Sequence, residues 1–187
     1  LVLNDDAQVG IPAADYLKIY RDVIFEIGLT PNRADAASHI GVARDIKGLL
    51  SLTNPSELKM PDVSRFNLIA AGTPTSNQNI SVVVEDYNAC PRYTGVTITN
   101  IKVAESPEWL KNFLKSIGVK CINNVVDITN FILHEMGQPL HAFDADKIAG
   151  KKVIVKKLAP GTKFTTLDNI ERELSGNELM ICDAEKP

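Results

Sequence analysis

Three polar side chains in the second half of the chain, Thr129, His141 and Asp144, are of types that can do chemistry together. A threonine hydroxyl can hold water or substrate, an imidazole can accept or donate a proton near neutral pH, and a carboxylate can orient either group or bind a metal. Each also has a common structural role. Thr129 could bond to a carbonyl of its own helix four residues back, His141 could be a structural histidine at a turn, and Asp144 could cap a short turn.

A metal-dependent hydrolase could use His134, His141 and Asp144, but the spacing gives this alternative little support. Neither an HExxH pattern nor a cysteine–histidine cluster occurs, and Gly137 and Pro139 lie between the two histidines. We therefore expect no structural or catalytic metal and no cofactor in this chain.

The candidate residues depend on one helix and the turn that follows it. Apolar residues recur at helical spacing between residues 125 and 133, which predicts a largely buried helix that carries Thr129. Gly137 is the predicted C-cap of this helix, and Pro139 prevents the helix from continuing. The chain changes direction just before His141, so we expect Thr129, Pro139 and His141 to converge on one concave site.

Periodicity and turn residues predict the other elements. Asp35 can cap the second helix, and Ser106 followed by Pro107 can begin a third helix that buries Trp109 and ends at Gly118. In chain order we expect a helix at 12–20, a strand at 23–27, a helix from 35 to about 50, strands at 80–84 and 94–103, a helix at 107–117, the helix from 124, and strands at 153–158, 163–167, 171–174 and 178–182, the middle pair joined at Asp168-Asn169.

Strands outnumber helices towards the end of the chain, which favours an α+β fold with a curved or barrel-like mixed β-sheet flanked by helices. Residues 51–79 are the least patterned stretch and the best candidate for a boundary. We therefore divide the chain into an N-terminal helical and strand segment at 1–50, an irregular connection at 51–79, and the core of the domain at 80–187.

Composition limits the classes of partner. With 187 residues, 44% hydrophobic and 23% charged, the chain is typical of a globular protein, and its net charge of −3 excludes an overall basic surface for nucleic acid. Contact with RNA would have to be local, through lysines that could equally form a solvated strand surface. These lysines are Lys151, Lys152, Lys156 and Lys157.

The cysteines and the apolar runs indicate a cytoplasmic protein. Cys90, Cys121 and Cys182 are odd in number, widely spaced and without a CxxC pattern, so we expect core thiols in a reducing compartment. No run is long or apolar enough to span a membrane, and no signal peptide is evident. Because the chain begins at Leu1 rather than at a methionine, we expect it to be a piece of a longer protein.

Three separated motifs carry a resemblance to a known family. They are Leu29-Thr30-Pro31-Asn32-Arg33-Ala34-Asp35, Cys90-Pro91-Arg92-Tyr93-Thr94-Gly95, and the run from Asn123 to Phe131 followed by Gly137 to Asp144. In this order they resemble the central, editing part of the bacterial phenylalanyl-tRNA synthetase β subunit. The likeness begins near Asp22, has a variable gap at 51–79, and reaches about Asp183. It implies the same α+β fold and a cytoplasmic enzyme that ligates phenylalanine to tRNA(Phe), with ATP and magnesium used by the whole synthetase and an α subunit completing a heterotetramer.

Editing is needed because a pocket shaped for phenylalanine rejects tyrosine by only about 10²-fold. A second site can offer polar partners to the tyrosine hydroxyl and hydrolyse Tyr-tRNA(Phe). The resemblance implies that Thr129, Pro139 and His141 line that site, with His141 and Thr129 positioning water or substrate and neither acting as a nucleophile. Lys120 stands where some relatives have an arginine, and it keeps the charge but not the bidentate fork.

The resemblance also implies a departure. In the family a Met-Gly-Gly loop and an acidic residue that contacts the tyrosine hydroxyl follow this region, so we expect the isolated 187-residue chain to be nearly inactive. The main alternative is a non-catalytic RNA-binding or scaffolding domain in which His141 is structural.

Overall fold

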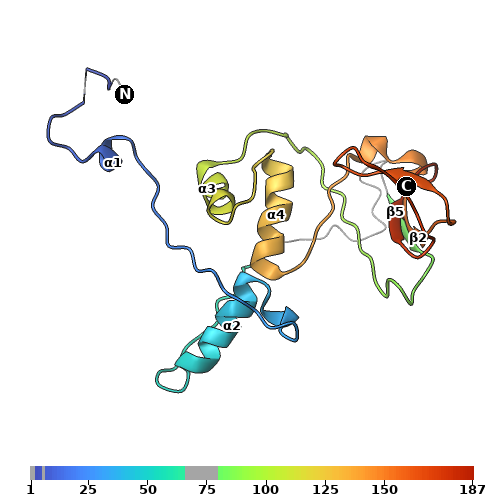
Figure 1. The fold of residues 1–187 in the computed structure, drawn as a ribbon, viewed down its shortest axis with the longest axis horizontal. Helices are drawn as coiled ribbons and strands as arrows, with labels where there is room; N and C mark the ends of the chain where they lie inside the picture. The colour runs from blue at the N-terminus through green and yellow to red at the C-terminus, as the bar shows by residue number, and fades with distance from the viewer. Residues whose placement is uncertain (1–2, 6, 66–79) are drawn as a thin grey trace. The chain divides into compact units, whose positions relative to one another are not determined.

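The computed structural model describes residues 3–5, 7–65 and 80–187 and forms two compact units (Figure 1). The first unit comprises Leu1–Pro61 and Val103–His141, and the second comprises Asp62–Lys102 and Ala142–Pro187. Each unit therefore combines two stretches that are distant in sequence. The predicted division at 1–50, 51–79 and 80–187 stays a prediction, and residues 66–79 of its connection lie outside the described residues.

The first unit is helical. It contains α1 (Ala13–Tyr16), the 3-10 helix η1 (Ala34–Ala36), α2 (His39–Leu50), α3 (Glu108–Ser116) and α4 (Asn124–Met136). Both α2 and α3 pack against α4. Their buried apolar side chains include Leu110 and Leu114 of α3 and Ile40 of α2. Burial of these side chains holds α4 in place, because apolar surface removed from water contributes about 25 cal/mol per Å².

The helix α4 begins and ends where its flanking residues supply hydrogen bonds. The side-chain oxygen of Asn123 accepts from the backbone N–H groups of Val125 and Val126, both at 3.0 Å. At the other end Gly137 has φ 75°, a left-handed conformation that glycine adopts without strain, and its N–H donates to the Leu133 carbonyl at 2.8 Å. The predicted C-cap is confirmed.

Three predictions for the N-terminal part of the chain are wrong. The helix expected at 12–20 is only the single turn α1, and residues 23–27 form no strand. Asp35 does not cap α2, because it lies within η1 and its carboxylate pairs with Arg33, the residue before η1, at 3.0 Å. Ser38 has the extended backbone of an N-cap, and its hydroxyl oxygen accepts from the Gly41 N–H at 3.0 Å.

The start of α3 also differs from the prediction. Pro107 is the N-cap itself, and the buried Ser106 turns its hydroxyl inward to donate to Asp127 at 2.5 Å. The end of α3 agrees with the prediction, because the helix runs to Ser116 with Ile117 as its C-cap, and Gly118 follows in the left-handed conformation with φ 78°. Trp109 is 58% exposed rather than buried, since it lies edge-on against one ring of α4 and not in the core.

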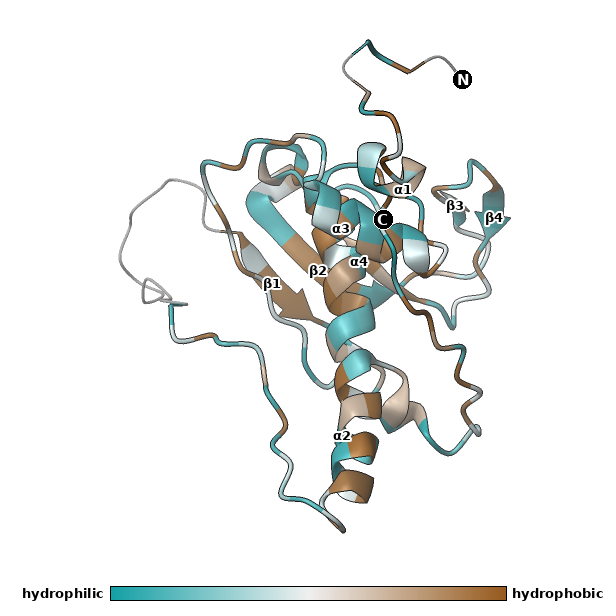
Figure 2. Ribbon diagram, turned by 90° about the vertical axis from the view of Figure 1, so that its left-hand side faces the viewer, coloured by the Kyte–Doolittle hydropathy of each residue, from teal (hydrophilic) through white to brown (hydrophobic). Residues whose placement is uncertain are grey.

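The second unit is built on a small mixed sheet. Strands β1 (Ser81–Val84), β2 (Lys152–Lys157) and β5 (Leu179–Cys182) lie in the order β1-β2-β5, with β1 parallel and β5 antiparallel to β2. Figure 2 shows the apolar residues of β1 and of the middle of β2. Two 3-10 turns, η2 (Ala145–Lys147) and η3 (Ala149–Lys151), precede β2, and β3 (Lys163–Thr165) and β4 (Glu171–Glu173) form a separate hairpin.

The predicted fold class is confirmed in its coarse form. The structure is α+β with a mixed sheet, and the predicted turn at Asp168-Asn169 joins β3 to β4, with φ 61° at Asn169. The described residues form no closed barrel, so the curved or barrel-like sheet is not confirmed. Residues 94–103 form no strand, because none of the described strands pairs with them.

Candidate functional site

The four candidate residues all belong to the first unit, on α4 or on the segments that flank it. Thr129 is half-buried in the second turn of α4. Lys120 is exposed on the segment between α3 and α4, while Pro139 and His141 are exposed on the segment after Gly137. The candidate site therefore depends on how firmly α4 is held.

Thr129 forms the hydrogen bond to its own helix that was its predicted structural role, but to a different carbonyl. Its hydroxyl donates to the Val126 carbonyl at 2.7 Å, three residues back rather than the predicted four. Because this bond uses the only hydroxyl hydrogen, the oxygen lone pairs remain as acceptors. Thr129 can therefore accept a hydrogen bond from a water molecule or from an ammonium group of a substrate.

The segment from Gly137 to His141 leaves the helix at a fixed point. The left-handed Gly137 turns the chain, and Pro139 locks its own φ, so that the exposed His141 lies on a segment of restricted conformation. The His141 side chain is exposed. Burial of this side chain in the core would have excluded a site there. The convergence of Thr129, Pro139 and His141 stays a prediction.

Asp127 is the polar residue near the site that the sequence argument missed. It is 1% exposed, and its two carboxyl oxygens accept from the Ser106 hydroxyl at 2.5 Å and from the Ile122 N–H at 2.8 Å. Ser106 precedes α3 and Ile122 follows it, so one side chain fastens α4 to both ends of α3. The available signal was an acidic residue flanked by Val126 and Ile128 in an apolar helix.

A second connection fastens the start of α4 to the same segment. The N–H of Asn124 donates to the Ala104 carbonyl at 2.9 Å, and the Asn124 side-chain oxygen accepts from the Ala104 N–H at 3.1 Å. One backbone bond and one side-chain bond therefore join two residues that are 20 positions apart. The first turn of α4 is thus fixed at its cap and at two points along the chain before α3.

Aromatic side chains fill the contact between α3 and α4. The Phe131 ring of α4 lies edge-on to Phe113, with centroids 4.9 Å apart, and to Trp109, at 5.5 Å. His39 of α2 packs in the same way against Phe113 at 5.1 Å. Such edge-to-face pairs contribute about 0.5–1.5 kcal/mol each beyond their buried area. They give the helices a defined angle around the candidate site.

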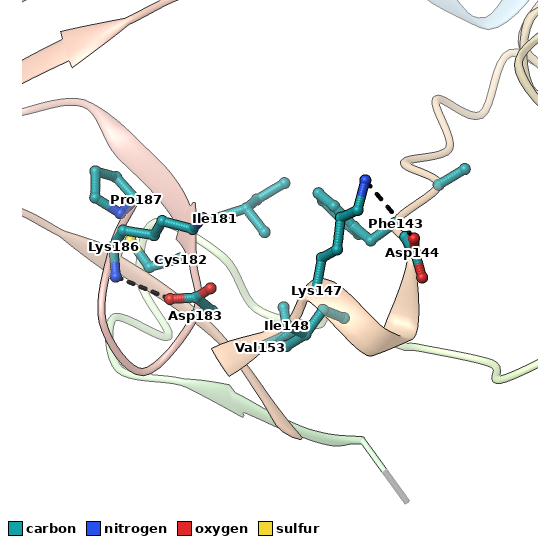
Figure 3. Close-up of a pocket in the computed structure, with 11 residues that line it drawn as sticks. Phe143, Asp144, Lys147, Ile148, Val153, Ile181, Cys182, Asp183, Lys186 and Pro187 are labelled. Atoms are coloured by element: carbon teal, nitrogen blue, oxygen red, sulfur yellow. Dashed lines mark hydrogen bonds and ion pairs between the residues drawn. The ribbon is translucent and has the colours of Figure 1, made fainter. Parts of the chain in front are cut away.

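The second unit contains a hollow of about 320 Å³ between η2 and the end of β5 (Figure 3). Its apolar wall includes Phe143, Val153 and Ile181, and its rim carries the ion pair between Lys147 and Asp144 at 3.9 Å. Asp144 also accepts from the Asp146 N–H at 3.1 Å, which confirms its predicted capping role. This hollow is lined by residues other than the four candidates.

Asp183 lies at the rim of the hollow, and its carboxylate has a structural role as a hydrogen-bond acceptor for backbone groups. Its carboxylate accepts from the backbone N–H groups of Glu185 and Lys186 at 2.8 Å and of Ala149 at 3.1 Å, and these bonds lower its pKa. Burial raises the pKa of the adjacent Cys182 thiol. The rim is therefore a rigid turn that ties η3 to the end of β5.

Other predicted features are only partly as expected. All three cysteines are free, but Cys182 alone is buried, while Cys90 and Cys121 are half-buried. Among the predicted lysines, Lys157 pairs with Asp86 at 3.0 Å and Lys151 donates to the Ala145 carbonyl at 2.8 Å, so part of that positive charge is already engaged.

Within the described ranges, no group of three or more histidine, cysteine, aspartate or glutamate side chains could hold a metal ion. None of the helices in that part of the chain is both long and apolar enough to cross a bilayer.

Comparison with known proteins extends the likeness beyond the predicted limits. The family described as "B3/4 domain" matches residues 89–187. The chain is 51% identical over 185 residues to the phenylalanine–tRNA ligase β subunit of Porphyromonas gingivalis and 51% identical over 187 residues to that of Bacteroides thetaiotaomicron. The β subunit of Salinibacter ruber is 46% identical over 191 residues.

These alignments cover 98–100% of the chain, so the likeness is not limited to residues 22–183. The chain spans 22% of the length of each of these relatives. The family match covers more than half of the sequence and includes Thr129, Pro139 and His141. The chain is similar to one part of phenylalanine–tRNA ligase β subunits, and it belongs to the B3/4 domain family.

Proposed function

We propose that this chain is the tRNA-editing part of a phenylalanyl-tRNA synthetase β subunit and that it helps to hydrolyse Tyr-tRNA(Phe). The observation that carries the proposal is the identity of about half of all residues to such β subunits, together with the B3/4 match. The complete cytoplasmic enzyme would join phenylalanine to tRNA(Phe) with ATP and magnesium. Its partners would be tRNA(Phe) and an α subunit, and its mixed sheet would be curved or barrel-like.

The proposed reaction is the addition of water to an ester. A water oxygen attacks the tyrosyl carbonyl carbon, the bond to the ribose oxygen breaks, and tyrosine and tRNA with a free terminal hydroxyl are released. An aminoacyl ester is reactive enough that a positioned water can suffice, and positioning alone can lower the barrier by several kcal/mol. No covalent enzyme intermediate is required.

The candidate residues suit positioning. Thr129 offers acceptor lone pairs because its hydrogen is engaged by Val126. His141, exposed on a restricted segment, would order the attacking water or hold the terminal adenosine. Lys120 is exposed and would contact the backbone phosphates near the acceptor end, and Pro139 would form an apolar wall. Phe-tRNA(Phe) would escape hydrolysis, because its phenylalanine side chain would leave polar groups of the full site unpaired.

The decisive experiment uses the complete α and β subunits with His141→Ala. Tyr-tRNA(Phe) should accumulate at least tenfold faster than with the wild type, while the rate of phenylalanine charging stays within about twofold. Accumulation is measured with radiolabelled tyrosine, and deacylation with preformed Tyr-tRNA(Phe).

His134→Ala is the matched control, since it removes the same side chain from α4 seven residues earlier. It should edit normally. Unchanged accumulation in His141→Ala would contradict an editing role for that residue. Wild-type enzyme that binds tRNA but does not deacylate Tyr-tRNA(Phe) would favour the alternative of a non-catalytic RNA-binding or scaffolding domain.

A further inference from the structure

Asp127 is a buried carboxyl group whose two hydrogen bonds reach opposite ends of α3. Its oxygens accept from the Ser106 hydroxyl and the Ile122 N–H, and among the described residues no basic side chain forms an ion pair with it. Burying a carboxyl group without a cationic partner is costly, and an apolar side chain of similar volume would often give a more stable helix contact. The arrangement therefore suggests a geometric role beyond stability.

The geometry of α4 indicates what Asp127 controls. Two helix positions differ by about 200° around the axis, so Asp127 and Thr129 project from nearly opposite sides of α4. Holding Asp127 against the segments around α3 fixes the rotation of α4 and hence the direction of Thr129. A rotation of α4 about its axis by a fraction of a turn would point the Thr129 hydroxyl away from a ligand in the site.

The second hydrogen bond of Asp127 acts on the segment between α3 and α4. Ile122 lies two residues after Lys120, so its bond to Asp127 at 2.8 Å restrains the exposed segment that carries Lys120. Asn124 and Ala104 restrain the backbone nearby but do not contact Ile122 through their paired bonds. Asp127 is thus one group that links the segment of Lys120 to the helix of Thr129.

We infer that Asp127 is a positioning residue of the editing site, which keeps Thr129 and Lys120 in register through its hydrogen bonds to Ser106 and Ile122. The inference rests on the proposed function. Asp127 does not contact substrate, and its effect is exerted through the placement of the other residues.

The test compares two variants of the complete synthetase. In Asp127→Asn the remaining oxygen can accept from Ile122 N–H while the amide donates to the Ser106 oxygen, so both contacts are kept. In Asp127→Ala both are lost. We expect the kcat for deacylation of Tyr-tRNA(Phe) to fall at least tenfold in the alanine variant and less than threefold in the asparagine variant, with phenylalanine charging unchanged.

Folding is measured independently by the thermal melting of each variant of the complete synthetase. Assays are run well below the melting temperature of each variant, where a merely stabilising residue would leave kcat unaltered. If the alanine variant does not fold, Ser106→Ala removes one of the two bonds and should lower kcat by an intermediate factor. Glu108→Gln, which alters an exposed carboxylate on α3, is the control and should behave as wild type.

The outcomes separate the two proposals. If the wild type deacylates Tyr-tRNA(Phe) and the folded Asp127→Ala or Ser106→Ala variants do so equally fast, the positioning role is overturned and the proposed function stands. If the wild type does not deacylate at all, both fall. A graded loss in the order Ala, Ser106→Ala, Asn, with normal charging, supports the inference.

Discussion

Thr129 offers a test at the scale of one residue, because its hydroxyl hydrogen and oxygen have separate roles. Thr129→Val keeps the shape but removes the acceptor, so we expect deacylation of Tyr-tRNA(Phe) to fall at least tenfold. The free energy of unfolding should change by less than about 1 kcal/mol, since the bond to Val126 lies within the helix. Thr129→Ser keeps the hydroxyl and should retain most activity; an inactive serine variant would mean that the methyl group, not the oxygen, is required.

The residues that the sequence revealed are those with local partners. Gly137 and Asp144 are caps whose bonds reach only a few residues, so their roles follow from residue type and position. Ser106 was misassigned as a cap because its actual partner, Asp127, is 21 positions away. Nothing in the local pattern of either residue specifies that contact. The roles of His141 and Pro139 came from family resemblance and not from spacing.

At the scale of the element, α4 depends on its cap. Asn123→Ala removes the acceptor for two N–H groups at the helix start, and we expect the free energy of unfolding to fall by about 1 kcal/mol. Urea denaturation followed by Trp109 fluorescence measures this change. Asn54→Ala, at an exposed position after α2, is the control and should change stability little. Equal stability of the Asn123 variant and the wild type would show that water replaces the cap.

Strand predictions were confirmed where the strand has a hydrogen-bonded neighbouring strand and were wrong where it has none among the described residues. The hairpin of β3 and β4 was predicted because its turn residues lie between two short apolar or charged runs. The runs at 23–27 and 94–103 are richer in β-branched residues than the strands of this hairpin, yet neither run is a strand in the structure. A strand needs a hydrogen-bonded neighbour, and composition does not supply one.

At the scale of the whole molecule, acid should weaken the second unit. The pKa values of Asp183 and Asp86 are lowered from 3.8, by hydrogen bonds from Glu185 and other backbone groups in the first case and from Ala89 and Lys157 in the second. Their contribution to stability is therefore complete above about pH 4 and is lost as the pH falls through the lowered values.

The measurement is the melting temperature between pH 2 and pH 7. Asp183→Asn should lower the melting temperature at pH 7 and make it less dependent on pH below 4. Asp15→Asn, an exposed change in α1, should leave the curve unaltered. A steeper loss in Asp183→Asn than in the wild type would contradict the assigned sign.

The α+β class was predictable from the number and order of apolar runs, but the division into two interleaved units was not. The contact that closes the second unit pairs Ser81 with Lys152, and the residues of α3 and α4 lie between them in the sequence. Parallel pairing over such a distance leaves no local signal, since no turn connects the two strands directly. The sequence pattern therefore identified the strands but not the neighbours of each.

This parallel pairing of β1 with β2 also bears on the order in which the chain folds. Closing a long loop carries an entropic cost that rises with the number of residues enclosed, and contacts between distant residues slow folding. The helices α3 and α4 are near neighbours in sequence and can associate early, which shortens the effective distance between the two strands. During synthesis β1 must wait for β2, so its apolar residues Val82, Val83 and Val84 stay unpaired until β2, which follows both helices in the sequence, has left the ribosome.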